Sequence, residues 1–185
     1  NNQGTFHESL NMAALWNLPV LYVCENNLYG IGTRIDRSTA VLDQYQRVSA
    51  YNIPSAQEDG QDFDLVYKAA TTAVEHVRSG KGPYFLELMT YRYRGHSMSD
   101  SNAYRAKTEE RMWSDRDPVI ILRDRLVEAG ELTLDEYTDM DTAVLDEIED
   151  EVIRYATESP EPKVADVEKY VLAENDPWVT GGVQS

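Results

Sequence analysis

The sequence is poor in cysteine and in basic residues. Cys24 is the only cysteine among the 185 residues, so no disulfide bond can form within the chain. It lies inside an apolar run, where we expect a buried, unreactive thiol. Lysine and arginine number 17 against 33 acidic residues, which gives a formal net charge of −16. So acidic a chain is poorly suited to bind nucleic acid or an anionic membrane surface.

Long apolar runs are also missing. No stretch approaches the roughly 18 apolar residues of a membrane-spanning helix, and no secretory signal opens the chain. We therefore expect no membrane partner and a location in a cytoplasm or an organelle matrix, with the bacterial cytoplasm favoured. Asn1–Gly4 look like the middle of a loop, which indicates a cut within a longer sequence. Gly30-x-Gly32 lacks the third glycine of a dinucleotide-binding fingerprint.

Two apolar segments predict strands of a parallel sheet. Residues 19–24 and 84–89 lack polar alternation, which is typical of parallel strands covered on both faces. A short apolar helix at 11–16 precedes the first of them. A weaker strand lies within residues 50–58, and Asp62 caps a crossover helix of 3.6-residue period after it. This order predicts an α/β fold, a parallel sheet flanked by helices.

The C-terminal part of the sequence predicts a helical extension. Thr108 can cap one helix, and Asp117-Pro118 begins the next with proline at the first helical position. Thr133 and Glu136 form a capping box for a third helix. The third helix carries an apolar stripe formed by Val144, Leu145, Ile148, Val152 and Tyr155.

These patterns divide the chain into two predicted parts. Residues 1–105 form an α/β domain that lacks its N-terminal portion. Residues 106–185 form the helical extension and a tail. Pro160, Pro162 and Pro177 predict that this tail runs extended over a neighbour.

Paired asparagines follow the first strong strand. Glu25-Asn26-Asn27 comes directly after the apolar run, and Gly30 and Gly32 follow within a few residues. In open α/β sheets ligands bind at the carboxyl ends of the strands, and asparagine and backbone oxygens suit magnesium. An asparagine-rich turn without any ligand explains the same spacing.

A histidine between arginines and hydroxyls follows the second strong strand. Tyr91 to Arg105 is too long and too specific for a simple connector. His96 could transfer protons near neutral pH, and arginine binds phosphate oxygens with forked contacts. If the two strands are parallel, His96 and Asn27 lie at the same sheet edge. A basic surface loop is the alternative. His76 is expected in solvent, and His7 has no partner at a metal-ligand spacing.

Both constellations belong to an ordered series of motifs that covers nearly the whole chain. The series is Asn2-Gln3-Gly4 with Glu8, Asn11-Met12-Ala13-Ala14-Leu15-Trp16, Glu25-Asn26-Asn27, Tyr29-Gly30-x-Gly32-Thr33, Thr90-Tyr91-Arg92, Gly95-His96-Ser97-Met98-Ser99-Asp100, Tyr104-Arg105, Asp117-Pro118 and Ser159-Pro160-Glu161-Pro162. The chain closely resembles the α subunits of the thiamine-diphosphate-dependent 2-oxo acid dehydrogenases. The resemblance implies the thiamine-diphosphate-binding fold.

The resemblance also implies roles for four residues. Asn27 would give its side-chain oxygen and Tyr29 its backbone carbonyl to Mg²⁺, which bridges the diphosphate of thiamine diphosphate. His96 would be the active-site histidine near that diphosphate. Ser97 matches a position that is phosphorylated in mitochondrial homologues. The Gly-Asp-Gly that opens the cofactor motif would fall just before Asn1, so one metal ligand is absent from this chain.

As an activity, the resemblance implies oxidative decarboxylation of pyruvate with acyl transfer to the lipoyl group of the E2 acyltransferase. The implied assembly is an α₂β₂ heterotetramer with the E1 β subunit. Ser101 to Arg105 resembles the branched-chain 2-oxo acid enzymes instead. A branched-chain or acetoin dehydrogenase α subunit therefore stays open as an alternative, as does a catalytically incomplete α-like interaction protein.

Overall fold

The computed structural model describes residues 1–167 and 169. The chain forms two compact units, Asn1–Leu132 and Thr133–Ser185. The first contains α1 (Gly4–Leu15), β1 (Leu21–Asn26), β2 (Tyr29–Gly30), β3 (Thr33–Arg34), a 3₁₀ turn (Ile35–Arg37), α2 (Gln44–Arg47), a second 3₁₀ turn (Val48–Tyr51), β4 (Ser55–Asp59), α3 (Phe63–Arg78), β5 (Tyr84–Met89), α4 (Lys107–Ser114) and α5 (Pro118–Glu128). The predicted functional boundary after residue 105 stays a prediction, and α4 and α5 belong to the first unit.

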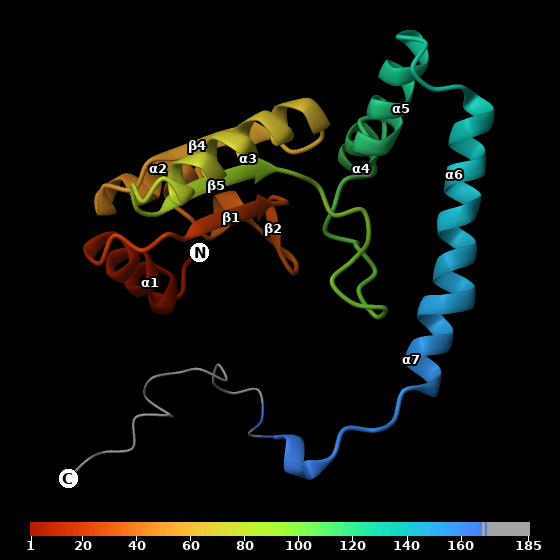
Figure 1. Cartoon of the computed structure of the whole chain (residues 1–185). Helices are drawn as coiled ribbons and strands as arrows, with labels where there is room; N and C mark the ends of the chain where they lie inside the picture. Colours follow the sequence, from red (N-terminus) through yellow and green to blue (C-terminus); the bar gives the residue numbers. More distant parts are fainter. Residues whose placement is uncertain (168, 170–185) are drawn as a thin grey trace. The chain divides into compact units, whose positions relative to one another are not determined.

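The main sheet has three parallel strands in the order β1-β5-β4. Figure 1 shows β5 between the other two, with all three arrows pointing the same way. Asn26 lies opposite Met89, and Asp59 lies opposite the same residue from the other side. The expected parallel pairing is confirmed, and all three strands end at one edge of the sheet. Residues 27–30 and 90–105 leave the sheet at that edge.

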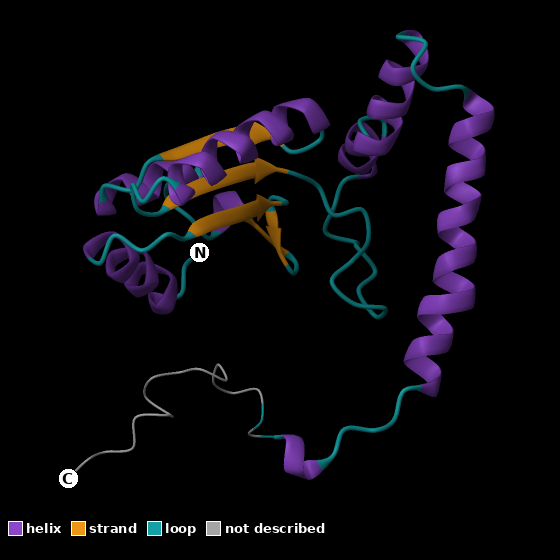
Figure 2. Ribbon diagram, viewed as in Figure 1, coloured by secondary structure: helices purple, strands orange, loops and turns teal. Residues whose placement is uncertain are grey.

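Helices cover both faces of the sheet (Figure 2). Successive side chains of a strand point to opposite faces. Phe85 of β5 meets Phe6 of α1 with ring centroids 6.2 Å apart, whereas neighbouring Tyr84 meets His76 of α3 at 5.4 Å. The predicted α/β class, a parallel sheet flanked by helices, is therefore confirmed. The buried cluster on the α1 side consists of Leu10, Val48, Ile53 and Phe85.

Two expectations for the first two elements need correction. β1 is not covered on both faces, because Val23 is 53% exposed and Glu25 is also exposed, whereas Tyr22 and Cys24 pack on the core. β1 is an edge strand, and its second face is open among the described residues. The first helix also begins earlier than residue 11, at Gly4.

Three of the predicted helix starts are confirmed. The Asp62 carboxylate accepts the backbone N–H groups of Asp64 and Leu65 at the start of α3. Asp117 caps α5 in the same way, with proline at its first position. The Thr133–Glu136 capping box forms at the start of α6 (Leu134–Glu147). Each cap satisfies amide donors that have no partner inside the helix.

The expected cap of α4 is wrong. Ala106 occupies the N-cap position in an extended conformation, and its carbonyl accepts the N–H groups of Glu109 and Glu110 at 3.0 and 3.1 Å. Thr108 lies one residue inside the helix, whose bounds are Lys107–Ser114. The chain enters this helix without a side-chain cap, so the preference of threonine for caps does not decide where it starts.

The second unit is helical over most of its described part. α6 continues through a π-helical segment, Ile148–Ile153, into α7 (Arg154–Glu158), and a short 3₁₀ turn follows at Val164–Asp166. The predicted apolar stripe is present but exposed, with 45% for Ile148 and 77% for Tyr155. Most of the predicted extended tail lies outside the described residues. Within the described chain, no helix combines the length and apolarity needed to cross a membrane.

Candidate functional site

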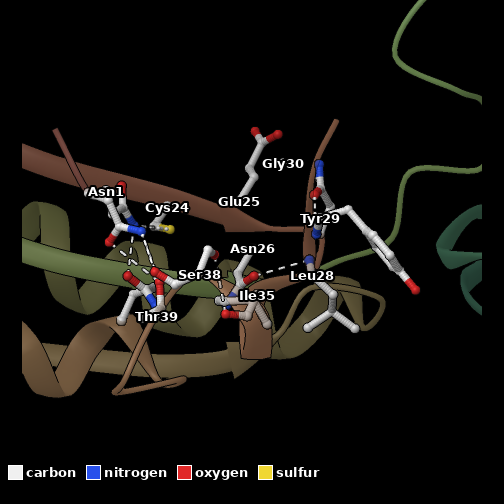
Figure 3. A pocket seen from close by; sticks show the side chains of 13 residues that line it. Asn1, Cys24, Glu25, Asn26, Leu28, Tyr29, Gly30, Ile35, Ser38 and Thr39 are labelled. Atoms are coloured by element: carbon white, nitrogen blue, oxygen red, sulfur yellow. Dashed lines mark hydrogen bonds between the residues drawn. The ribbon is translucent and has the colours of Figure 1, made fainter. Parts of the chain in front are cut away.

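The chain turns sharply where β1 ends, and both asparagine side chains shape the turn. The Asn26 Oδ1 atom accepts the N–H of Leu28, and the Asn27 Oδ1 atom accepts the N–H of Tyr29, each at 3.1 Å. Figure 3 shows the first of these bonds as a dashed line between Asn26 and Leu28. Leu28 adopts a left-handed conformation with φ of 69°. The chain turns after β1 as expected, and the bonds hold a backbone that a leucine rarely adopts.

A small hairpin continues from this turn. β2 and β3 pair Gly30 with Thr33 and Tyr29 with Arg34. The N–H of Ile35 donates to the Leu28 carbonyl at 2.8 Å, so hydrogen-bonded pairs flank the Tyr29–Arg34 pair. In an antiparallel ladder these pairs alternate, and the backbone groups of the intervening pair point outward. The Tyr29 carbonyl therefore faces away from β3.

Asp100 organises the loop that follows β5. Its carboxylate accepts the His96 N–H at 2.8 Å, the Asn102 N–H at 3.0 Å and the Tyr104 hydroxyl at 2.8 Å. These bonds, led by the one from the His96 N–H, lower the pKa of Asp100 below its usual value. Gly95 lies so close that a Cβ there would be 2.7 Å from the Asp100 carbonyl oxygen. Asp100 thus folds the Gly95–His96 corner back on the loop.

Two cavities open beside the end of β1 and share Asn27, Tyr29 and Gly30. The first has a volume of about 240 Å³ and lies between the asparagine turn and the N-terminal residues. Asn1 and Asn2 line it, as do Ser38 and Thr39, to which the Asn2 amide donates at 2.9 and 3.2 Å. Figure 3 shows the Asn1 amide beside Cys24, to whose sulfur it donates at 3.2 Å.

The second cavity, of about 280 Å³, brings three of the predicted residues together. Asn27 and Tyr29 reach it from the turn after β1, and His96 reaches it from the loop after β5. The His96 side chain is exposed. Ser97, the fourth predicted residue, is also exposed, and its hydroxyl lies 3.0 Å from the Ser99 hydroxyl. The fold therefore gathers motifs that are about 70 residues apart in the sequence, because parallel strands end at a common edge.

Basic side chains line the second cavity although the chain is acidic. Two arginines line it, Arg92 and Arg105, and its described lining contains no carboxylate. Arg105 is only 6% exposed, and its guanidinium lies 4.9 Å from the ring centroid of Tyr29 and 5.1 Å from that of Tyr91. It also donates to the Arg92 carbonyl. Aromatic faces hold this cation, and Asp100 interacts with it electrostatically, so part of its charge is balanced within the loop.

Tyr29 also connects the hairpin to α4. Its hydroxyl donates to the Glu109 Oε2 atom at 2.8 Å. Burial, and then this hydrogen bond to a carboxylate, raise the pKa of Tyr29 above its usual value. The phenol is therefore a neutral donor at physiological pH. The hairpin wall of the cavity is fastened to α4 at this point.

The cysteine and the other two histidines do not line the second cavity, although Cys24 lines the first. Cys24 is half-buried rather than buried as expected, and burial raises the pKa of its thiol. That the thiol is unreactive stays a prediction. His76 is not in solvent as expected, since it packs on the Tyr84 ring and its Nε2 atom is buried without a hydrogen-bond partner. The His7 Nδ1 atom lies 2.8 Å from the Tyr51 hydroxyl. Among the described residues, no group of three or more histidine, cysteine or acidic side chains could hold a metal.

Comparison with known proteins identifies the family. The profile of the dehydrogenase E1 component matches residues 1–165. The chain belongs to the dehydrogenase E1 component family. It is 48% identical over 172 residues to the pyruvate dehydrogenase E1 component subunit alpha of Rhizobium meliloti (strain 1021), an alignment that covers 92% of this chain and 49% of that protein. Its identity to the human mitochondrial somatic form of that subunit is 41% over 183 residues, covering 98% of this chain and 46% of the human protein.

The resemblance deduced from the motifs is thus confirmed. This E1 family chain spans about half the length of the curated relatives it matches. Proteins of the E1 family depend in general on thiamine diphosphate. The names of the relatives also identify them as the α subunit of a multisubunit component.

Two residues of this E1 chain contribute to the site although the motifs gave them no role. Arg105 was only part of the Tyr104-Arg105 match, and its burial among tyrosines depends on contacts between three segments. Glu87 is fully buried in β5 and binds Asn26. Its signal in the sequence is a single charge within an otherwise apolar strand, which is costly unless the charge is hydrogen-bonded.

Proposed function

We propose that this chain is the part of a pyruvate dehydrogenase E1 α subunit that binds the diphosphate of thiamine diphosphate and its Mg²⁺. One observation carries the proposal. Asn27, Tyr29 and His96 line a single cavity, together with two arginines, at the carboxyl ends of two parallel strands, in a chain whose relatives are named pyruvate dehydrogenase E1 α subunits. Such a cavity suits a phosphorylated, anionic ligand.

The chemistry of the donors fits magnesium. The Asn27 Oδ1 atom uses one lone pair for the Tyr29 N–H, and an amide oxygen has a second. The Tyr29 carbonyl points away from its neighbouring strand, which leaves it free to bind outside the hairpin. Both are hard oxygen ligands, and Mg²⁺ takes few protein ligands beside phosphate oxygens and water. Asn27 and Tyr29 would hold the ion, and a further protein ligand would come from residues that precede Asn1.

The other lining residues have distinct tasks in this proposal. The Arg92 and Arg105 cations balance the diphosphate charge. His96, exposed at the cavity, holds or releases a proton beside the substrate. When bound, thiamine diphosphate supplies the electron sink for decarboxylation of a 2-oxo acid. The acyl group would then pass to the lipoyl group of the E2 acyltransferase.

The proposed assembly is an α₂β₂ heterotetramer. The β subunit would supply the glutamate that activates the cofactor, so this chain alone would be inactive. The greater identity to the Rhizobium relative than to the human one supports a bacterial cytoplasm over an organelle matrix. Cell fractionation tests this location, and recovery of the chain in an organelle would contradict it.

The substrate is tested with the complete α/β enzyme. We expect a higher kcat/KM for decarboxylation of pyruvate than for 3-methyl-2-oxobutanoate, and no turnover without thiamine diphosphate. Equal efficiency with both acids would contradict the assignment to pyruvate. A complete enzyme that neither binds thiamine diphosphate nor decarboxylates either acid would contradict the whole proposal.

A further inference from the structure

Glu87 is a fully buried carboxylate on the central strand β5, with 0% of its surface exposed. Its Oε1 atom accepts the Asn26 amide at 2.7 Å. Its Oε2 atom accepts the Tyr45 N–H and the Gln57 amide, both at 3.0 Å. These donors come from β1, α2 and β4 respectively. No lysine or arginine is among these bonded partners, so neutral donors alone satisfy the carboxylate.

Burying a carboxylate is expensive, and an apolar side chain at this position would avoid that cost. What a carboxylate offers at this position, and an apolar residue cannot, is a set of acceptors for three buried donors. An ionised carboxylate only accepts hydrogen bonds, so every polar group that faces it has to be a donor. This requirement fixes the orientation of the Asn26 side chain, which has one donor end and one acceptor end.

The fixed orientation of Asn26 shapes the turn. Because its NH₂ group faces Glu87, its Oδ1 atom faces the other way and accepts the Leu28 N–H at 3.1 Å. Leu28 is held at φ of 69°, and the residues on either side of it are Asn27 and Tyr29. Asn26 is itself only 7% exposed, so water does not compete freely for these bonds. A chain of two hydrogen bonds thus runs from the buried carboxylate to the turn that lines both cavities.

We propose that Glu87 is a positioning residue, which acts through Asn26 to set the turn that presents Asn27 and the Tyr29 carbonyl to the site. The inference rests on the proposed function for the identity of the ligand, thiamine diphosphate with Mg²⁺. It adds a residue that touches neither cavity and that takes no part in the chemistry.

The Glu87→Gln variant tests the bond between Glu87 and Asn26, because glutamine keeps the size of the side chain and replaces one acceptor oxygen by a donor. Its amide has one donor end, so the new NH₂ group faces either the NH₂ group of Asn26 or the donors of Tyr45 and Gln57. The second arrangement leaves two buried donors without an acceptor, whereas the first leaves one, so we expect the first. In the first arrangement the two NH₂ groups face each other, or the Asn26 amide rotates and presents its NH₂ group to the Leu28 N–H, and both changes disturb the turn.

A second substitution should repair the defect. In the Asn26→Asp/Glu87→Gln variant, the new amide at 87 donates to one carboxylate oxygen at 26, and the other oxygen accepts the Leu28 N–H. The remaining oxygen at 87 still accepts from Tyr45 and Gln57. The double variant therefore has as many hydrogen bonds as the wild type, and only the bond between residues 26 and 87 has its donor and acceptor exchanged. The total charge is unchanged.

Gln57→Leu serves as the matched control. It removes a donor from the same carboxylate but leaves the Asn26–Leu28 connection intact. A role of Glu87 in general sheet stability predicts that Gln57→Leu and Glu87→Gln behave alike. A positioning role predicts that only Glu87→Gln weakens ligand binding.

The experiment is calorimetric titration of thiamine diphosphate, at fixed Mg²⁺, into the complete apo α/β enzyme, with thermal unfolding of each variant alongside. We expect Kd to rise at least about tenfold for Glu87→Gln and to return close to the wild-type value in the double variant. Gln57→Leu should leave Kd unchanged. An unchanged Kd for Glu87→Gln, no recovery in the double variant, or an equal loss in Gln57→Leu would overturn the inference. If Glu87→Gln fails to assemble, the double variant decides by the same criterion.

The Asn27→Ala variant separates the two proposals. If it weakens binding while Glu87→Gln does not, the positioning role is wrong and the proposed function stands. If the wild-type complete enzyme does not bind thiamine diphosphate, the proposed function is wrong.

Discussion

Residues of the site differ in how firmly the fold holds them. Asn26 is buried and bonded at both ends of its amide, whereas the His96 side chain is exposed and only its backbone is fastened, to Asp100. The fold thus fixes the asparagine turn tightly and leaves the histidine imidazole accessible to a ligand. Substitutions at exposed positions usually change the free energy of unfolding by less than about 0.5 kcal/mol. His96 can therefore be replaced without disturbing the fold.

For His96→Ala in the complete enzyme, we expect the kcat for acyl transfer to the lipoyl group to fall at least about a hundredfold. A positioned acid–base group contributes this much or more to a rate. Unfolding temperature should not change. Steady-state kinetics with the lipoyl domain of E2 as acceptor measures the effect. The neighbouring Met98→Ala is the control, since that side chain is fully exposed. Wild-type turnover by the His96 variant would remove the residue from the reaction.

Ser97 lies beside His96, and its carbonyl accepts the Asp100 N–H at 3.0 Å. A phosphate here would add a charge of about −1.5 to −2 near the cavity and repel an anionic substrate. We expect Ser97→Glu to raise KM for pyruvate about fivefold, the effect of about 1 kcal/mol between nearby exposed charges. In the control variant Ser97→Gln, the glutamine has the size of glutamate but no charge, so this variant should retain the KM of the wild type. A similar KM in both variants would show that charge at this position does not matter.

Prediction from the sequence succeeded where local patterns determine the position of a residue. Asn27, Tyr29 and His96 follow strands whose apolar runs are visible, so their shared edge could be deduced. It failed where contacts between distant segments decide. His76 lies on the side of α3 that meets Tyr84, which the helix pattern alone did not reveal. Arg105 acquires its role only when three tyrosine rings surround it.

Among the elements, the start of α3 combines a cap with an ion pair. Asp62 caps the helix and also pairs with Arg125 of α5 at 2.7 Å. The hydrogen bond from Arg125 is the main cause that lowers the pKa of Asp62 to about 2. A carboxyl group whose pKa is lower in the folded state stabilises the fold above its unfolded pKa. That contribution is lost as the pH falls through the folded pKa.

For Asp62→Asn we expect a lower unfolding temperature than wild type at pH 6, since asparagine keeps the cap but loses the ion pair. The difference should shrink as the pH falls from about 4 toward 2, and it should shrink in high salt because the pair is exposed. Thermal unfolding of the complete enzyme over this pH range measures it. Asp139→Asn on α6 makes the same charge change at an exposed site. A difference that stays constant with pH would exclude the ion pair as its cause.

The elements themselves were largely predictable, because caps and periodicity are local. Asp62, Asp117 and Thr133 begin helices as their side chains predict. The start of α4 was missed because Ala106 has no capping side chain. The open face of β1 was missed because an apolar run was taken to mean that both faces of the strand are covered. Among the described residues nothing covers the face that carries Val23, which is exposed.

At the scale of the whole molecule, we propose that the chain holds one side of a binding site. Its cavities lie at the carboxyl edge of a three-stranded sheet, and it spans about half the length of its relatives. The ligands proposed for Mg²⁺ are two uncharged oxygens, on Asn27 and Tyr29. A site that relies on neutral ligands from this chain needs the remaining ligands from the rest of the subunit and from the diphosphate. Binding should therefore be measured in the complete enzyme.

The central claim is that Asn27 binds the metal that holds the cofactor diphosphate. Calorimetric titration of thiamine diphosphate with Mg²⁺ into the complete enzyme, in its wild-type, Asn27→Ala and Asn11→Ala forms, tests this claim most directly. Asn11 is an exposed residue of α1 and serves as the control. We expect Asn27→Ala to weaken Mg²⁺-dependent binding at least about tenfold, as loss of a metal-site partner does, and Asn11→Ala to match wild type. Equal affinity in all three forms would contradict the account.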